Sequence, residues 1–269
     1  MVRRAWILPL IFSVVLVGLF VSIVSAGQGT TVYLPAVYNQ PTPTPTATPT
    51  PTPTPAPAFS DNFCNSNSGW PIVSNSVTTV GYLTCEYQIV VKQAGYVVTV
   101  GHNLVETDFT AALDAHAASS VDGTYGFDFG DSNAGFYDYE VGNGQFYLAR
   151  YDANTQAWTN LIGLTPASAI LPGTQTNHLE VSRAGSTITL YVNGQQVGQI
   201  NDSALGQGDV GLAASGNSAP FDARFDNFVL YSSGSVVAAG SPGQANAAAV
   251  REFKRAPAGA PTTPTPPPA

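Results

Sequence analysis

The chain has 269 residues, and only 10% of them are charged, with 17 acidic residues against 9 basic ones and a formal net charge of −8. The imbalance is larger between positions 58 and 232, where sixteen Asp and Glu residues and four Lys and Arg residues give a net charge of −12. Such a surface repels phosphate backbones and anionic headgroups, which argues against nucleic acid or anionic lipid as a partner. Solubility alone would explain the charge, and so would binding of a cation or a sugar.

The first 26 residues have the pattern of a secretory signal peptide. Arg3 and Arg4 precede an apolar run over positions 5–24, and the residues at 24–26 suit cleavage by a signal peptidase. The run is long for a secretory core, so an uncleaved membrane anchor is the alternative. In both cases we expect export by the general secretory route and a location outside the cell or on its surface.

Residues 27–57 are expected to form a short extended segment and a spacer. The strand-like stretch 31–38 is broken by Pro35, and from position 41 to 57 eight of seventeen residues are proline. Proline fixes φ and favours the polyproline II conformation, so this stretch is predicted to be semi-rigid. Spacers of this composition resemble the linkers of bacterial cell-surface and carbohydrate-active proteins.

Residues 58–232 contain many short β-rich runs between clusters of Gly, Asn, Asp and Ser, and no helical period. The most regular is the meander over 176–200, where Ile188, Leu190 and Val192 recur at every second position. Asn193-Gly194 then fits a type I′ turn, because both residues accept positive φ. The other strands are expected at 77–83, 85–91, 96–100, 104–115, 125–129, 135–141, 145–151, 158–162, 209–213 and 221–231. We therefore predict an all-β domain built as a sandwich of two antiparallel sheets.

The two ends of this region carry two further predictions. The stretch 59–63 and the last strand, 221–231, share an Asp-Asn-Phe pattern, and we expect them to lie side by side. Beyond position 232 the chain becomes a low-complexity Ala/Gly/Pro tail, residues 233–269, with a short helix expected over 245–255.

The chain has two cysteines, Cys64 and Cys85, both early in the predicted domain. An exported protein with an even number of cysteines favours a disulfide between them. Closing a loop of this length would contribute roughly 3 kcal/mol by the chain-entropy argument. Metal ligation is the alternative, although no histidine lies nearby at ligand spacing.

Short motifs follow one another in a fixed order along residues 58–232. They are FSDNF, SGW and GYL at the start, YGFDFG, AGFYDYEVGNGQFYLARYD and WTNLIG in the middle, and NHLEVSRAGSTITLYVNGQQVG, DVGLAA and FDNFVLY at the end. In this order they resemble the concanavalin A-like, laminin-G-like jelly-roll modules of bacterial exported proteins. The resemblance implies a concave and a convex sheet, with sugars met on the concave side. It does not choose between lectins, glycan-binding modules, glycosidases and adhesive domains, which share the fold.

Alternation along the middle strands predicts which side chains point to the open, concave face. If Tyr125, Phe127 and Phe129 are core, Asp128 points the other way. The ligand face is then expected to hold Asp128, Phe136, Asp138, Glu140, Tyr147, Tyr151 and Trp158. Aromatic rings beside carboxylates suit a sugar, because a ring covers the apolar face of a pyranose while the carboxylates accept from its hydroxyls. The alternatives are that the aromatics are core, or that a register slip of one residue exchanges the two faces.

The glucanases of this fold carry E-x-D-x-E on one strand, and the comparable stretch here has Phe136 in place of the first glutamate. Asp138 and Glu140 remain, about 7 Å apart if they share one face of a strand, nearer to the spacing of inverting glycosidases than of retaining ones. We therefore expect an exported, non-catalytic, monomeric module that binds a polysaccharide or a surface glycan. A structural or protein-adhesive domain without a sugar site is one alternative, and a glycoside hydrolase using Asp138 and Glu140 is the other.

The resemblance also implies a structural calcium ion. Glucanases with this jelly roll hold calcium with an aspartate of the final strand and with backbone carbonyls from the first strand and a nearby turn. Asp226 matches that aspartate by position, and strand alternation would place it among aromatic residues, where a free carboxylate is costly. The alternative is that Asp226 accepts backbone N–H groups at a bulge, with no metal.

Overall fold

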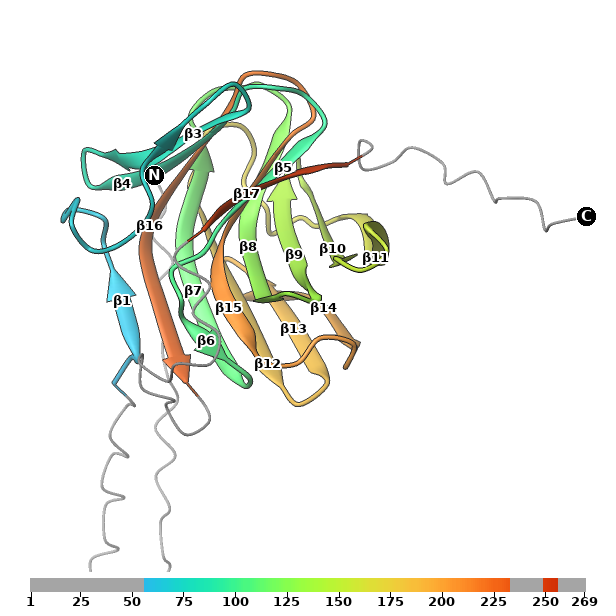
Figure 1. The fold of residues 1–269 in the computed structure, drawn as a ribbon. Helices are drawn as coiled ribbons and strands as arrows, with labels where there is room; N and C mark the ends of the chain where they lie inside the picture. Colours follow the sequence, from blue (N-terminus) through green and yellow to red (C-terminus); the bar gives the residue numbers. More distant parts are fainter. Residues whose placement is uncertain (1–55, 233–248, 256–269) are drawn as a thin grey trace, which may run out of the picture. The chain divides into compact units, whose positions relative to one another are not determined.

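The computed structural model describes residues 56–232 and 249–255. These two stretches form strands and connections only, with no helix, so neither contains a helix long and apolar enough to cross a membrane (Figure 1). The predicted signal peptide, residues 27–55 of the predicted extended segment and spacer, and most of the predicted tail lie outside the described residues.

Two antiparallel sheets form a sandwich, as the sequence predicts. Sheet A contains β1 (Phe59–Asp61), β2 (Val73–Ser74), β3 (Thr78–Leu83), β4 (Glu86–Val91), β7 (Phe109–Ala117), β12 (Asn177–Ala184), β13 (Thr187–Val192), β14 (Gln195–Asn201) and β16 (Phe221–Ser232). Sheet B contains β5 (Tyr96–Val100), β6 (Val105–Glu106), β8 (Gly123–Ser132), β9 (Gly135–Gly142), β10 (Gln145–Asp152), β11 (Ala157–Pro166), β15 (Gly208–Gly216) and β17 (Val250–Lys254). The order is β14-β13-β12-β7-β16-β4-β3-β2 in sheet A, with β1 also on β16. In sheet B the order is β11-β10-β9-β8-β15-β5-β17, with β6 also on β15.

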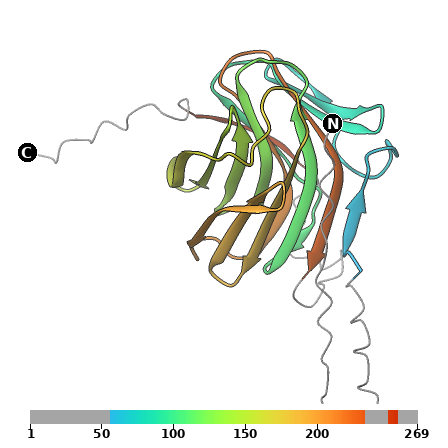
Figure 2. The ribbon, with the colours of Figure 1, turned by 180° about the vertical axis from the view of Figure 1, so that it is seen from behind.

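The local sequence explains the meander of sheet A. Leu179 and Val181 of β12 are buried while their neighbours are more exposed, which is the period of two of a half-buried strand. Asn193 and Gly194 have φ values of 50° and 77°, so the type I′ turn predicted from this dipeptide is confirmed. In Figure 2, the view from behind, β7 and β16 of the same sheet lie side by side.

Aromatic rings fill the space between the sheets. The rings of Phe127 on β8 and Phe228 on β16 lie 6.3 Å apart, and those of Phe129 on β8 and Phe109 on β7 lie 5.8 Å apart. The four side chains are at most 1% exposed. Truncating such a ring typically costs about 3–5 kcal/mol, because both the transfer energy and the packing around the ring are lost. The prediction that Phe127 and Phe129 point into the core is confirmed.

The first and last strands of the folded region pair as predicted. β1 runs antiparallel to β16, with Phe59 opposite Leu230 and Asp61 opposite Phe228. The disulfide between Cys64 and Cys85 is present, and it ties the loop after β1 to the turn between β3 and β4. The start of the domain is therefore fixed both by strand pairing and by a covalent link.

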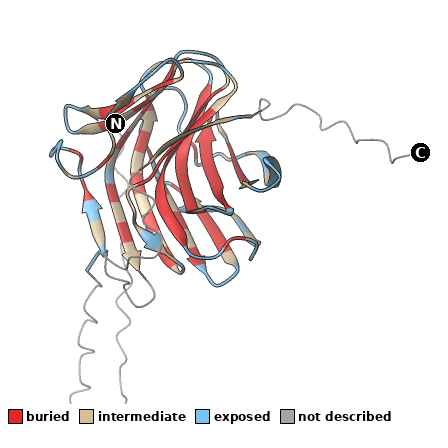
Figure 3. Cartoon of the chain, in the orientation of Figure 1, coloured by how far each residue is buried: buried red, intermediate tan, exposed pale blue. Residues whose placement is uncertain are grey.

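The central strands of sheet B are buried on both faces. β9 and β15 are buried at every position, and β8 at all but its last residue, whereas β7 of sheet A alternates between buried and half-buried residues. Figure 3 shows this as continuous red along these strands. The inner face is covered by sheet A, so the outer face must be covered by something else.

The cover comes from the segment that the sequence predicts to be a helix. That prediction is wrong for residues 250–254, which form β17 and pair antiparallel with β5, from Val250 opposite Val100 to Lys254 opposite Tyr96. The strand is favoured because Arg251 and Phe253 alternate with Glu252 and Lys254, so that one side of the segment can face the sheet. In Figure 1 this dark red strand crosses in front of β8 and β9.

Loss of the disulfide is expected to destabilise the domain. The double variant Cys64→Ser/Cys85→Ser removes a covalent link between residues 21 positions apart in the sequence. Because the unfolded chain then gains conformational entropy, the free energy of unfolding should fall by roughly 3 kcal/mol. Urea denaturation of the two proteins measures the difference. An unchanged midpoint would contradict this role.

Candidate functional site

The structure brings the seven predicted ligand residues together on the outer face of sheet B. Asp128 on β8 lies opposite Asp138 on β9, and Tyr147 on β10 lies opposite Glu140. At one side, Phe136, Tyr151 and Trp158 form an aromatic group, with ring centroids 5.1 to 5.5 Å apart. Carboxyl groups and an aromatic group are thus adjacent, as alternation along the strands predicts.

The centre of this face is a hydrogen-bonded pair of carboxyl groups. The hydroxyl of Tyr147 lies 3.0 Å from Asp138 Oδ2 and 2.6 Å from Glu140 Oε2. Glu140 also accepts hydrogen bonds from the hydroxyls of Thr124 and Ser215, the latter at 3.0 Å from its Oε1. The tyrosine hydroxyl has one proton and can donate to only one carboxylate, so the other contact requires a proton on a carboxyl group.

The position of Arg255 beside Asp138 points to Glu140 as the protonated member of the pair. Burial raises the pKa of Glu140 well above its usual range, and the neighbouring Asp138 carboxylate raises it further. Burial also raises the pKa of Asp138, but the guanidinium of Arg255 opposes that rise. Since like charges so close together cannot both be ionised at low cost, the proton resides on the group without a cation.

Two further aspartates extend the acidic face. Burial raises the pKa of Asp128 well above its usual range, as does repulsion from Asp131, and neither carboxyl oxygen of Asp128 has a hydrogen-bond partner among the described residues. Burial also raises the pKa of Asp131, to about 6, against the opposing charge of Arg251. Additional negative charge on this face would therefore be unfavourable.

The expectation that this face is open is wrong. Asp128, Phe136, Asp138 and Glu140 are 0% exposed, and Tyr147 is 2% exposed. Each points away from the core between the sheets, as predicted, but residues 249–255, called the C-terminal segment below, lie across it. The sequence could not place this cover, because the segment follows a low-complexity stretch.

The C-terminal segment is held by backbone and side-chain contacts. The amide of Gly101 donates to the carbonyl of Ala249 at 2.9 Å, and the amide of Arg255 donates to the carbonyl of Gly95 at 2.9 Å. These bonds continue the β5–β17 ladder at both ends. The backbone of the segment thus occupies the edge of sheet B.

Every second side chain of the segment faces the acidic and aromatic groups. Arg251 forms an ion pair with Asp131, and the ring of Phe253 lies 4.8 Å from that of Phe136. Arg255 Nη1 lies 2.9 Å from Asp138 Oδ2. The guanidinium of Arg255 also sits 4.3 Å from the ring centroid of Tyr147 and 4.7 Å from that of Trp158, a cation–π arrangement. The segment therefore matches the charge and the rings of the face residue by residue.

Sequence reasoning missed several members of this site. They are Thr124, Asp131 and Ser215 on the sheet and Arg251, Phe253 and Arg255 on the C-terminal segment. A usable signal was present in the charge distribution, because residues 251–255 carry three basic side chains while residues 58–232 carry only four.

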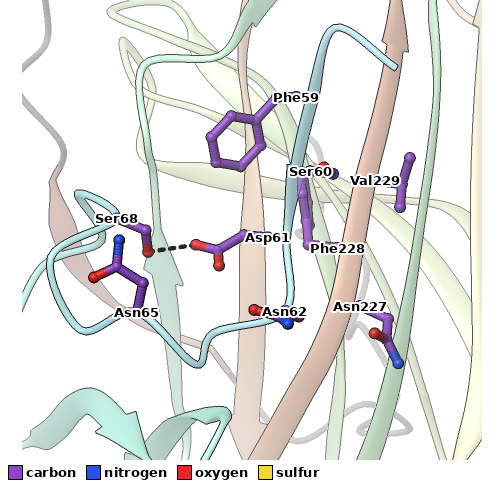
Figure 4. Close-up of a pocket in the computed structure, with 9 residues that line it drawn as sticks. All are labelled: Phe59, Ser60, Asp61, Asn62, Asn65, Ser68, Asn227, Phe228 and Val229. Atoms are coloured by element: carbon purple, nitrogen blue, oxygen red, sulfur yellow. Dashed lines mark hydrogen bonds between the residues drawn. The ribbon is translucent and has the colours of Figure 1, made fainter. Parts of the chain in front are cut away.

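A hollow lies between β1 and β16 of sheet A (Figure 4). Its volume is about 490 Å³, and it is lined by Phe59, Ser60, Asp61, Asn62, Asn65, Ser68, Asn227, Phe228 and Val229. The carboxylate of Asp61 accepts hydrogen bonds from the backbone N–H of Phe63, from Ser68 and from the indole of Trp70, so it serves to join the first loop to the core. This hollow is separate from the acidic face.

Asp226 does not lie among aromatic side chains as predicted. A bulge between Asp226 and Val229, with Asn227 at φ 51°, interrupts the alternation, so Phe225 and Phe228 are both buried while Asp226 is half-exposed. Its Oδ1 accepts the backbone N–H of Asn227 at 2.7 Å. Residues 56–232 and 249–255 contain no group of three or more His, Cys, Asp or Glu side chains that could hold a metal ion. The Oδ2 of Asp226 lies 3.3 Å from the side-chain amide of Asn227, which donates to it.

The sequence profile described as the concanavalin A-like lectin/glucanases superfamily matches residues 92–235. No curated protein matches the chain. Among solved structures, the chain is similar to carbohydrate-binding module CBM66 from Bacillus subtilis, with 17% identity over 60% of this chain and 100% of that one and a TM-score of 0.45. It is similar to LamAcat from Zobellia galactanivorans, with 11% identity, 65% and 97% coverage and a TM-score of 0.47. The β-glucanase of Bacillus licheniformis gives 14% identity, 66% and 99% coverage and a TM-score of 0.45.

Removing the Glu140 charge is expected to change how stability depends on pH. Its pKa is raised in the folded state, so folding stability falls as pH rises from the unfolded-state value, about 4.3, through the folded-state value. The variant Glu140→Gln has no carboxyl group to ionise at this position, so its stability should fall less than that of the parent protein between pH 4 and 8. Urea midpoints across this range measure the effect, with Glu180→Gln on sheet A as the control. Parallel curves for parent and Glu140→Gln would contradict a protonated Glu140.

We propose that Asp226, with backbone carbonyls from around Asp61 to Phe63 and near Gly81, forms a weak structural calcium site. One carboxylate with carbonyls and water resembles the millimolar class of extracellular calcium modules. Millimolar calcium should then raise the melting temperature, since it binds only the folded state, and Asp226→Asn should abolish the rise. A melting temperature that is the same in calcium and in chelator would exclude the site.

Proposed function

The chain belongs to the concanavalin A-like lectin/glucanases superfamily, and on this basis we propose that it is an exported, non-catalytic glycan-binding module. The proposed site is the outer face of sheet B. The observation that carries the proposal is the junction of the carboxyl pair Asp138 and Glu140 with the aromatic group of Phe136, Tyr151 and Trp158.

The chemistry of this junction suits a sugar ring. Indole and phenol rings can cover the apolar face of a pyranose, and the carbonyl oxygens of carboxyl groups can accept from its hydroxyls. Ser215 and Thr124, which now donate to Glu140, can each also accept from a hydroxyl, because a side-chain hydroxyl rotates freely. The site therefore offers both a flat apolar surface and several polar directions.

A glycan can reach this face only when the C-terminal segment leaves it. Trp158 and Tyr151 are half-buried with the segment in place, and none of the aromatic side chains in residues 56–232 or 249–255 is fully exposed. The apparent affinity for a glycan is then the affinity of the open face multiplied by the fraction of molecules in which the face is open. A domain without a sugar site, the structural or adhesive alternative, would keep the face closed under all conditions.

Hydrolysis is the second candidate function, and one observation favours it. Glu140 with a strongly raised pKa beside Asp138, which is paired with Arg255, resembles the division between a general acid and an ionised partner. Against it stands Phe136, whose ring packs on Phe253 at the place where a third acidic group would be needed. Reducing-sugar release that disappears in Glu140→Gln would decide for hydrolysis.

Export is proposed from the N-terminal segment and from the disulfide. The signal-peptide pattern of residues 1–26 and the Pro/Thr spacer suit display outside the cell. The Cys64–Cys85 link suits an oxidising compartment.

Weakening the C-terminal segment should strengthen glycan binding. Arg255→Gln removes the ion pair with Asp138 and the cation–π contacts, and Phe253→Ser removes the ring from the aromatic group. On a glycan array, each variant should bind the same glycans as the parent protein with an affinity increased several-fold.

The control for this experiment is Arg224→Gln, which removes an arginine paired with Asp222 on sheet A. Trp158→Ala should weaken binding in the parent and in the Arg255→Gln background. If neither the parent nor the opened variants bind any glycan, while all remain folded, the face is not a sugar site.

A further inference from the structure

The buried carboxyl groups of the acidic face need positive charge beside them, and residues 58–232 do not supply it. Four of its carboxyl groups, those of Asp128, Asp131, Asp138 and Glu140, are at most 8% exposed. Burying carboxylates without a cation or a full set of hydrogen bonds is costly, and two of these four carboxyl groups, those of Asp131 and Asp138, pair with arginines. Any group that is bound on this face must therefore compensate the charge of these carboxyl groups.

The four basic side chains of residues 58–232 are engaged elsewhere. Arg150 pairs with Asp202, Arg224 pairs with Asp222, and Arg183 donates to the carbonyls of Leu205 and Gly206. Lys92 donates to the Asn75 carbonyl at 2.7 Å. None of the four forms an ion pair with the acidic face in the described part of the chain.

The C-terminal segment supplies what is missing. Arg251 binds Asp131, Arg255 binds Asp138, and Phe253 fills the aromatic group between them. The order along the segment is cation, ring, cation, with each side chain separated by one residue that points away. The segment therefore acts as an internal ligand. Its side chains, two cations and a ring, indicate which chemical groups a ligand of this face should carry.

From this internal ligand we infer that the glycan bound by the outer face of sheet B carries positively charged amino groups, as in a polymer of glucosamine with free amines. The inference rests on the proposed glycan-binding function. The pyranose rings would take the place of Phe253 on the aromatic group, and the ammonium groups would take the place of the guanidinium groups on Asp131 and Asp138. An acidic glycan would be repelled, and a neutral one would leave these carboxylates buried without a cation.

The test compares two glycans with the same sugar backbone, one with free, charged amino groups and one with neutral, N-acetylated ones. Binding of β-1,4-linked glucosamine oligomers and of their N-acetylated counterparts of the same length is measured by calorimetry on the full chain, at low and high salt. We expect the free-amine oligomer to bind about tenfold more tightly or better, with a preference that shrinks as salt screens the charges. In the Arg251→Gln/Arg255→Gln variant, the free-amine oligomer should again bind more tightly than the acetylated one. Its affinity for this variant should be higher than for the parent protein.

Three variants connect the preference to this face. Asp131→Asn and Asp138→Asn should each reduce the preference for the free amine, whereas Glu180→Gln, which removes one negative charge from sheet A, should leave it unchanged. A synthetic peptide of residues 249–255 should compete with the amine oligomer. Melting curves identify any variant that fails to fold, and the other aspartate variant then serves alone.

The outcomes separate the inference from the function on which it rests. If the acetylated oligomer or another neutral glycan binds as tightly as the free amine, the inference of a cationic ligand is overturned while glycan binding stands. If Glu180→Gln lowers the preference as much as the aspartate variants do, the amine is attracted by net charge alone and the inference is also overturned. If no glycan binds, even with the segment weakened, the proposed function itself fails.

Discussion

Carboxyl groups buried on one face of sheet B require positive charge or protons, and this constraint shapes the rest of the site. Arg251 and Arg255 provide the charge at Asp131 and Asp138, and burial beside the Asp138 carboxylate raises the pKa of Glu140, which favours its neutral form. Breaking such a buried pair leaves an uncompensated charge, so displacing the segment that carries the arginines is costly unless another cation replaces them. The same constraint limits what can replace it.

Under the proposed function, this face has a closed state and an open state. With the C-terminal segment in place, it is a closed part of the sandwich, and β17 covers the edge of β5 that would otherwise expose unpaired backbone groups. With the segment displaced, it would present an aromatic group and several carboxyl groups to a ligand. Under the proposed function, the balance between these states depends on contacts that a glycan must match, so the segment would both protect the site and select its ligand.

Much of the sandwich could be predicted from the sequence, because alternation and turn chemistry are local. The meander, the Asn193-Gly194 turn and the pairing of β1 with β16 follow from short patterns, and the two faces of β8 and β9 were correctly separated. The bulge at Asn227 and the cover over Asp138 were not predicted. The first breaks the alternation by one residue, and the second is a long-range pairing that propensity near Phe253 does not reveal.

The central claim is that glycan and C-terminal segment compete for one face. Hydrogen exchange of the backbone amides in β17, measured with and without a bound glycan, tests it most directly. The account predicts that the amides of residues 250–254 exchange faster when the glycan is bound, because the segment has left β5. Bound glycan with unchanged or stronger protection of these amides would contradict the account.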